Sequence, residues 1–289
     1  MLRRAWVLLK ESLWGFLEDG AMMSGAAIAF YAIFSLAPVL VIAVAIAGYV
    51  FGQDAARNAV ADQVREVMGD PAAETITNLL ASAGRFDSGL IASVISLVTI
   101  IVTATGTFGA IESALNMIWR SETQYSAIRS TLRTRLTGLC LTLAVGLLLI
   151  ATLVADALLA ALKHTLEMLP HTQFLADAAN TAVSGLVLML AVGAMYRVLP
   201  QRRLPWRDVL LGAGVTTLLL SLGRYGIGLY MTGAGVATTY GAAGSLFVVL
   251  LWIYYSALIF LFGAEFTKAF TKHYSADRLA RQEAARASR

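Results

Sequence analysis

Residues 25–52 read GAAIAFYAIFSLAPVLVIAVAIAGYVFG and carry no charged side chain. A helix needs about 20 predominantly apolar residues to cross the hydrocarbon core of a bilayer, so this run predicts a membrane-spanning helix. Its apolar residues are continuous, whereas a strand of a membrane β-barrel alternates apolar and polar residues. The stretch therefore indicates an all-α membrane protein.

The composition of the whole chain supports a membrane protein. Of its 289 residues, 58% are hydrophobic and only 14% are charged, which leaves less polar surface than a soluble protein of this length needs. Several further runs are long enough to cross a bilayer. The sequence thus predicts six transmembrane helices, near 25–51, 89–119, 136–161, 177–199, 208–231 and 242–270.

Lysine and arginine are distributed unevenly between the ends of these helices. Most of the 22 basic residues fall at the N-terminus, at the C-terminus and in segments 120–135 and 197–207. Because such residues collect on the cytoplasmic side of membrane proteins, both termini are predicted to be cytoplasmic. The same rule accounts for the net charge of +4, so we expect no nucleic-acid partner.

Three regions are expected along the chain, and the second contains an external helical loop. Residues 1–20 place apolar side chains on one face with basic ones beside them, which predicts an amphipathic helix at the membrane interface. Residues 21–272 form the six-helix membrane domain, and residues 273–289 form a basic cytoplasmic tail. The external loop 52–88 spaces its apolar residues as helices do, so we expect two short helices folded over the outer mouth of the bundle.

Polar residues inside a membrane are costly, so each one needs a partner or a water-filled path. In the first helix, Pro38 removes a helical hydrogen bond near mid-bilayer and Ser35 can satisfy a freed carbonyl, which predicts a kink. In the second helix, a stripe of hydroxyl side chains includes Thr99 and Thr103. Such a stripe serves either helix–helix contact or a polar path.

A carboxylate and a carboxamide follow on the second helix, one turn apart. Glu112 and Asn116 lie on one face of a helix that is otherwise apolar at this depth. They either pair with an arginine at a neighbouring helix end, Arg197 or Arg120, or belong to a transport path. The sequence leaves both interpretations open.

The glycine-rich segment 220–245 places a cation and adaptable backbone at membrane depth. Glycine permits unwound helix, which is tolerated there only where protein or a water-filled cavity covers it. The segment is interpreted either as a re-entrant, partly unwound pocket formed by Arg224, Thr239 and Tyr240, or as a tight external turn. Glu265 lies near the cytoplasmic end of the last helix, where a pair with Lys268 or Arg197 is expected.

The sequence contains none of the common catalytic motifs. Its three histidines are far apart, and no spacing resembles a zinc site, a P-loop or a nucleophile elbow. The single cysteine, Cys140, excludes an intramolecular disulfide. We therefore expect no enzymatic activity, no metal and no cofactor.

Five motifs occur in a recognisable order: AAIAFYAIFSLAPVL at 26–40, TGTFGAIESALNMIW at 105–119, Leu199-Pro200 with Trp206, TYGAAGS at 239–245 and LLWIYYSALIFLFGAEF at 250–266. Together they resemble the YihY/virulence factor BrkB family. The resemblance implies a multi-pass protein of the bacterial cytoplasmic (inner) membrane, with six helices and cytoplasmic termini. That family has also been labelled ribonuclease BN, but this chain lacks an acid–base or metal cluster suited to RNA cleavage.

Two functions are consistent with these features. The hydroxyl stripe, Pro38, Glu112 and the segment around Arg224 favour a transporter or flippase-like protein for an anionic or amphipathic, lipid-like substrate. The alternative is a non-transporting membrane scaffold that binds a partner through loop 52–88 or the cytoplasmic tail. Membrane lipids are expected partners, and small residues on several helices permit a homo-oligomer.

Overall fold

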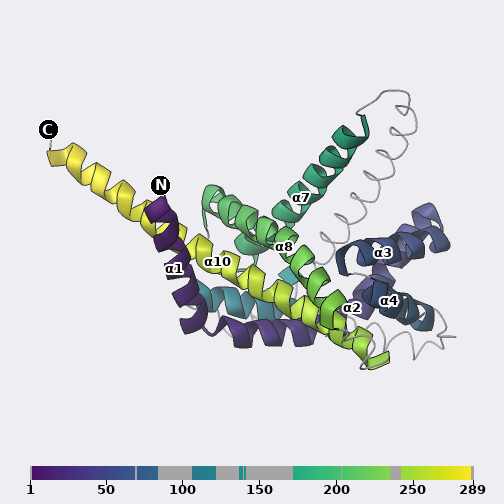
Figure 1. The fold of residues 1–289 in the computed structure, drawn as a ribbon. Helices are drawn as coiled ribbons and strands as arrows, with labels where there is room; N and C mark the ends of the chain where they lie inside the picture. The colour runs from purple at the N-terminus through teal and green to yellow at the C-terminus, as the bar shows by residue number, and fades with distance from the viewer. Residues whose placement is uncertain are drawn as a thin grey trace.

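The computed structural model describes residues 2–68, 70–83, 106–121, 137–138, 140, 172–202, 204–234 and 242–287. The regular structure of these residues is entirely helical, which agrees with the all-α prediction (Figure 1). The named helices are α1 (Leu2–Glu18), α2 (Ala21–Phe51), α3 (Gln53–Met68), α4 (Asp70–Ala83), α7 (Thr172–Val198), α8 (Trp206–Ala234) and α10 (Ala242–Ala287). A further helical stretch covers residues 106–118.

The first two helices meet at a sharp bend. Gly20 lies between them with a φ of 62°, a left-handed conformation that glycine adopts without steric cost. The axes of α1 and α2 differ by 66° across this break. The side chains of Ser12 and Phe16 on α1 are buried, whereas Trp6 and Leu13 are exposed. Helix α1 therefore has two distinct faces, as the sequence predicts for an interfacial helix.

Helix α2 continues through Pro38 to Phe51 and ends at Gly52, which has a φ of 91°. The side chain of Pro38 lies outside the described residues, so the kink expected there stays a prediction. The chain then turns directly into α3.

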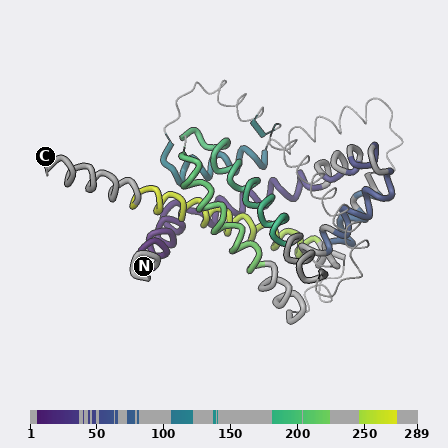
Figure 2. Tube along the Cα trace, turned by 90° about the horizontal axis from the view of Figure 1, so that it is seen from above, coloured from purple at the N-terminus to yellow at the C-terminus, as the bar shows by residue number. Residues whose placement is uncertain are grey.

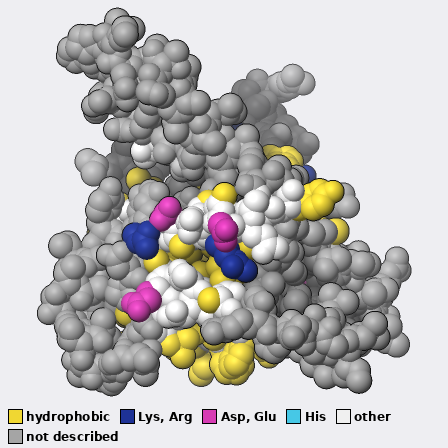
Figure 3. Space-filling model, turned by 90° about the vertical axis from the view of Figure 1, so that its right-hand side faces the viewer, with side chains coloured by type: hydrophobic (Ala, Val, Ile, Leu, Met, Phe, Trp, Pro, Cys, Tyr) yellow, Lys and Arg dark blue, Asp and Glu magenta, His cyan; other side chains and the backbone are white. Residues whose placement is uncertain are grey.

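The prediction of two short helices in loop 52–88 is confirmed by α3 and α4. They pack on the C-terminal half of α2 through a separate apolar cluster, whose buried members are Val44, Ala47, Ala56, Ile76 and Leu80. Helix α4 also contacts α10. The right-hand side of Figure 1, where α3 and α4 lie, carries basic and acidic side chains close together among its described residues (Figure 3). Arg65 and Asp62 pair at 2.6 Å on this surface.

Helix α10 is the central element of the described fold. It contacts α1, α2, α4 and α8, and it runs past the others toward the C-terminus (Figures 1 and 2). Helix α1 lies along the C-terminal half of α10, so both ends of the chain lie at the same end of the molecule. The predicted tail 273–289 continues α10 as helix up to Ala287.

Helices α8 and α10 approach each other closely through a reciprocal pair of small residues. A Cβ placed on Gly212 of α8 would collide with the Thr267 side chain of α10, and one placed on Gly263 of α10 would collide with Thr216 of α8. Each threonine hydroxyl donates to the carbonyl four residues earlier on its own helix, at 2.9 Å for Thr216 and 2.8 Å for Thr267. Small residues of this kind allow close helix packing in membranes.

Two of the described helices are long and apolar enough to cross a membrane, at Thr181–Val198 and Leu246–His273, and a third span is added if α1 and α2 count as one bent span. Of the six predicted spans, four coincide with α2, α7, α8 and α10. The second is described only over its last part, and the third only at residues 137–138 and 140. Within the glycine-rich segment 220–245, α8 is continuous to Ala234, and residues 235–241 lie outside the described residues, so the choice between a partly unwound pocket and an external turn stays open.

Candidate functional site

The polar residues that the sequence singles out in the first and second helices meet at one contact. Ser35 on α2 lies 3.0 Å from the hydroxyl of Thr107, the last member of the hydroxyl stripe, and donates to the carbonyl of Ala32 at 3.0 Å. At this position the stripe serves helix contact, one of its two interpretations. Thr99 and Thr103 lie outside the described residues.

Asn116 has a structural role in the described fold. Its side-chain Oδ1 accepts a hydrogen bond of 2.9 Å from the backbone N–H of Gln201, in the connection between α7 and α8. It therefore holds the end of helix 106–118 against that connection.

Glu112 lies one turn earlier and is in a different situation. Its side chain is only 6% exposed, beside the core residues Ile111 and Leu115 in sequence. No hydrogen bond or ion pair joins it to another residue in the described ranges. The pairing with Arg197 is not observed, since that guanidinium donates to the carbonyl of Leu204 and lies 4.7 Å above the ring of Trp206.

Glu265 forms the ion pair expected for it, within a cluster of three charges. The ammonium of Lys268 lies 3.2 Å from Glu265 Oε2 and 2.5 Å from Asp19 Oδ2, in the bend between α1 and α2. Glu265 is 1% exposed, and its carboxylate lies so close to Gly15 of α1 that a Cβ there would be 2.5 Å from Oε2. The cluster therefore joins both ends of the chain.

The electrostatics of Asp19 follow from its position in this cluster. Burial by itself raises the pKa of the Asp19 carboxyl, but hydrogen bonds from Lys268 and Glu265 and the charge of Lys268 outweigh it. The net effect is a pKa below the ordinary value. Asp19 is thus held as a carboxylate, which keeps Lys268 in place.

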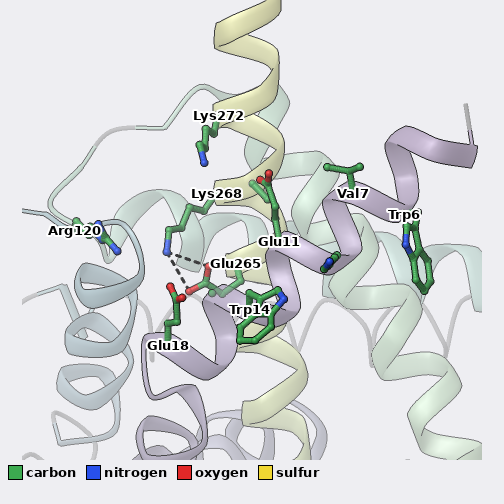
Figure 4. A pocket seen from close by; sticks show the side chains of 12 residues that line it. Trp6, Val7, Glu11, Trp14, Glu18, Arg120, Glu265, Lys268 and Lys272 are labelled. Carbon is green, nitrogen blue, oxygen red and sulfur yellow. Dashed lines mark hydrogen bonds and ion pairs between the residues drawn. The ribbon is translucent and has the colours of Figure 1, made fainter.

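A groove of about 580 Å³ opens beside this cluster, between α1, α10 and the turn after helix 106–118 (Figure 4). We call it the terminal groove. Glu265 lies at its buried side, and its other principal lining residues are Trp6, Lys10, Trp14, Arg120, Lys268 and Lys272. It contains both aromatic and cationic side chains, a combination suited to an anionic amphipathic molecule.

The predicted pocket of the glycine-rich segment lies outside what the structure describes. The backbone of Arg224 lies in helix α8, but its side chain is outside the described residues, and so are Thr239 and Tyr240. Their pocket stays a prediction. In the described ranges no group of three or more His, Cys, Asp or Glu residues could hold a metal ion.

A buried tyrosine was not anticipated from the sequence. The hydroxyl of Tyr196 on α7 lies 2.5 Å from the carbonyl of Phe260 and 2.9 Å from the hydroxyl of Thr216. It thereby joins α7, α8 and α10 in the centre of the core, beside Trp119. Nothing in the local sequence distinguishes this tyrosine from an interfacial one, because its partners are 20 and 64 residues away.

Comparison with known proteins gives two kinds of match, which differ in extent. The sequence profile described as virulence factor BrkB matches residues 13–288. Proteins named UPF0761 membrane protein from Yersinia pestis and Yersinia pseudotuberculosis are 30% identical over 178 residues, which is 61% of this chain and 58% of the relative. The match thus spans little more than half the length of these curated relatives. No solved structure matches the chain.

Proposed function

This chain belongs to the virulence factor BrkB family of membrane proteins, and from this premise we propose that it is a transporter or flippase-like protein of the bacterial inner membrane. Its substrate is an anionic or amphipathic, lipid-like molecule. The chain crosses the membrane six times and keeps both termini in the cytoplasm.

The observation that carries this proposal is Glu112. A carboxyl group buried among apolar helices is expensive, and such groups in membrane segments usually belong to a substrate or ion path. Glu112 is only 6% exposed, and no described residue pairs with it. Within the described residues, Glu112 therefore has the surroundings of a group that meets a transient ligand or water, whereas a purely structural carboxylate is normally paired.

The proposed orientation is supported by the arrangement of the chain ends. His273 of α10 lies 3.0 Å from Glu11 of α1, and Lys268 pairs with Asp19, so both termini lie on one side. An even number of spans requires this. The excess of basic residues at both ends favours the cytoplasmic side.

Cysteine labelling tests both the path and the orientation. In a Cys140→Ala background, we expect a membrane-impermeant maleimide to label Ala61→Cys in intact cells, and Ala280→Cys only after permeabilisation. Glu112→Cys should become labelled in permeabilised cells, because a transport path admits water. Ala114→Cys, a neighbouring core position that is 3% exposed, is the matched control and should stay unlabelled.

Two outcomes of this labelling would contradict the proposal. Labelling of Ala280→Cys from outside intact cells would overturn the orientation. Failure to label Glu112→Cys, when Ala61→Cys reacts normally, would mean a dry bundle. That result would favour the alternative of a scaffold that binds a partner through loop 52–88 or its C-terminal end.

A further inference from the structure

We propose that the terminal groove binds the phosphate headgroup of an anionic membrane lipid, with the acyl chains lying along the exposed face of α1. Figure 4 shows side chains from α1, α10 and the turn at Arg120 surrounding one space. The role of this groove, as the place where substrate lipid is held, depends on the proposed transport function. Its binding can be measured without transport.

Cations without ion-pair partners make the groove attractive to an anion. Lys10, Arg120 and Lys272 are exposed, and none of them makes a close ion pair with another described residue, although the charge of Arg120 also acts on Asp19. Lys268 is engaged by Asp19 and Glu265, so it contributes less. Charged lysine and arginine at a membrane surface each favour anionic lipids by about fivefold, from roughly 1 kcal/mol per residue.

Acidic residues in the groove set a limit on this attraction. Glu11 is paired with His273 at 3.0 Å. Glu18 also lines the groove, and its carboxylate is directed toward the same space as Lys268 in Figure 4. Glu18 is therefore expected to oppose anion binding, so its removal should strengthen the binding of an anionic lipid.

The backbone at Arg120 provides an independent observation. Helix 106–118 ends with the N–H of Arg120 donating to the carbonyl of Met117 at 3.2 Å and that of Ser121 donating to Asn116 at 2.9 Å. This pair of bonds is a Schellman motif, in which the residue at the Arg120 position is left-handed and is most often glycine. Arg120 has a φ of 46°, and it is the one non-glycine residue with positive φ in the described part of the chain.

Arginine is a costly choice at this position. Its Cβ is disfavoured in left-handed backbone, whereas glycine would adopt the same turn freely. The side chain that results lines the terminal groove. Because the backbone at this position is strained for arginine, its presence points to a role for the guanidinium itself. The planar guanidinium can bind two phosphate oxygens at once.

The groove borders the surface that faces lipid. At 3.6 residues per turn, the exposed apolar residues of α1 lie on one face, and Lys10 and Trp14 follow directly on the groove side of it. That apolar face consists of Trp6, Leu9, Leu13 and Leu17. A headgroup in the groove would therefore have its acyl chains beside Trp6 and Trp14, as expected for aromatic residues at a membrane interface. This placement favours a lipid over a free anion.

Tryptophan quenching by brominated lipids tests the site on the full chain in detergent micelles. Phosphatidylglycerol and phosphatidylcholine with brominated acyl chains are titrated separately. We expect phosphatidylglycerol to bind at least about fivefold more tightly. Arg120→Gly should lower that preference about fivefold while leaving the thermal midpoint unchanged or about 2 °C higher, because the left-handed strain is removed. Glu18→Gln should raise the preference.

Controls and competing anions make the result decisive. Arg202→Gln, which changes an exposed arginine outside the groove, should leave the preference unchanged. Arg120→Asn, which tolerates the same backbone, should reproduce the loss seen with glycine. Equal binding of the two lipids, or an unchanged preference in Arg120→Gly, would overturn the proposal. Displacement of phosphatidylglycerol by inorganic phosphate at equal concentration would make it a free-anion site instead. Glu112→Gln should keep its binding of phosphatidylglycerol, and this result would show that binding in the groove does not depend on transport.

Discussion

Replacing Gly212 by alanine is expected to abolish most of the folded protein. The added Cβ would overlap the hydroxyl of Thr267, lie 2.9 Å from its Cβ and lie 3.3 Å from the carbonyl of Gly263. Contacts below 3.0 Å force one helix to move, and α8 and α10 cannot separate without disturbing Tyr196, which bonds to both. Overpacking of a tight core costs about 1–3 kcal/mol and sometimes more, and we expect the upper end here.

The measurement is the fraction of monodisperse protein recovered in mild detergent, together with its thermal midpoint. Gly214→Ala is the matched control on the same helix, because its Cβ would meet only Met189 Sδ at 3.7 Å, an ordinary contact. Combining Gly212→Ala with Thr267→Gly should recover part of the loss, since the colliding side chain is gone. Equal recovery of the Gly212 and Gly214 variants would show that the two helices do not meet as described.

Removal of the ammonium group at position 268 should have the second large effect. In Lys268→Met, Asp19 and Glu265 would lose the counter-ion that lies between them, and Glu265 is almost completely buried. Breaking a buried ion pair from one side costs about 3–5 kcal/mol, because the remaining charge is left uncompensated. The partial exposure of Lys268 places the expected loss at the lower end of that range.

Thermal unfolding in detergent measures this loss, and two comparisons identify its cause. Lys272→Met changes an exposed lysine one turn further along α10, which makes no described ion pair, and should leave the midpoint unchanged. Adding Glu265→Gln to Lys268→Met should restore part of the stability, since one of the two unpaired charges is removed. If the Lys268 and Lys272 variants unfold at the same temperature, the cluster does not hold α1 on α10.

Elements with strong local patterns could be predicted from the sequence. The two faces of α1 and the paired helices α3 and α4 follow from apolar spacing, which a helix converts directly into a buried stripe. The helices α2, α7, α8 and α10 lie where long apolar runs predict helix, whereas the six membrane spans stay a prediction. The pairing of Glu265 with Lys268 could be predicted because the two residues lie one helical turn apart.

Features made by distant contacts could not be predicted in this way. Asp19 joins Lys268 across 249 residues, and no local signal connects them. The terminal groove exists only after α1 has folded onto α10. Arg120 was considered as a partner for Glu112. Its left-handed backbone conformation could not be predicted from the sequence, because glycine is the residue usually found at such a position.

The glycines of segment 220–245 show where a sequence pattern leaves two interpretations open. Glycine weakens an isolated helix, so a partly unwound pocket was one interpretation and a tight external turn the other. In a membrane, however, backbone groups have no water to replace the helical hydrogen bonds, so a helix tolerates glycine and uses it for close packing. Gly223, where a Cβ would lie 2.5 Å from the ring of Tyr255, is such a contact within continuous α8.

The most direct test of the account is lipid translocation by the purified full chain in vesicles. Phosphatidylglycerol with a fluorophore on one acyl chain is reconstituted into both leaflets, and externally added dithionite bleaches only the lipid that reaches the outer leaflet. We predict that vesicles containing the protein bleach further than protein-free vesicles, that Glu112→Gln abolishes the difference, and that Ser113→Ala, at the exposed neighbouring position, preserves it. Bleaching by the wild-type protein no greater than that of protein-free vesicles would contradict the claim that this chain moves an anionic lipid across the membrane.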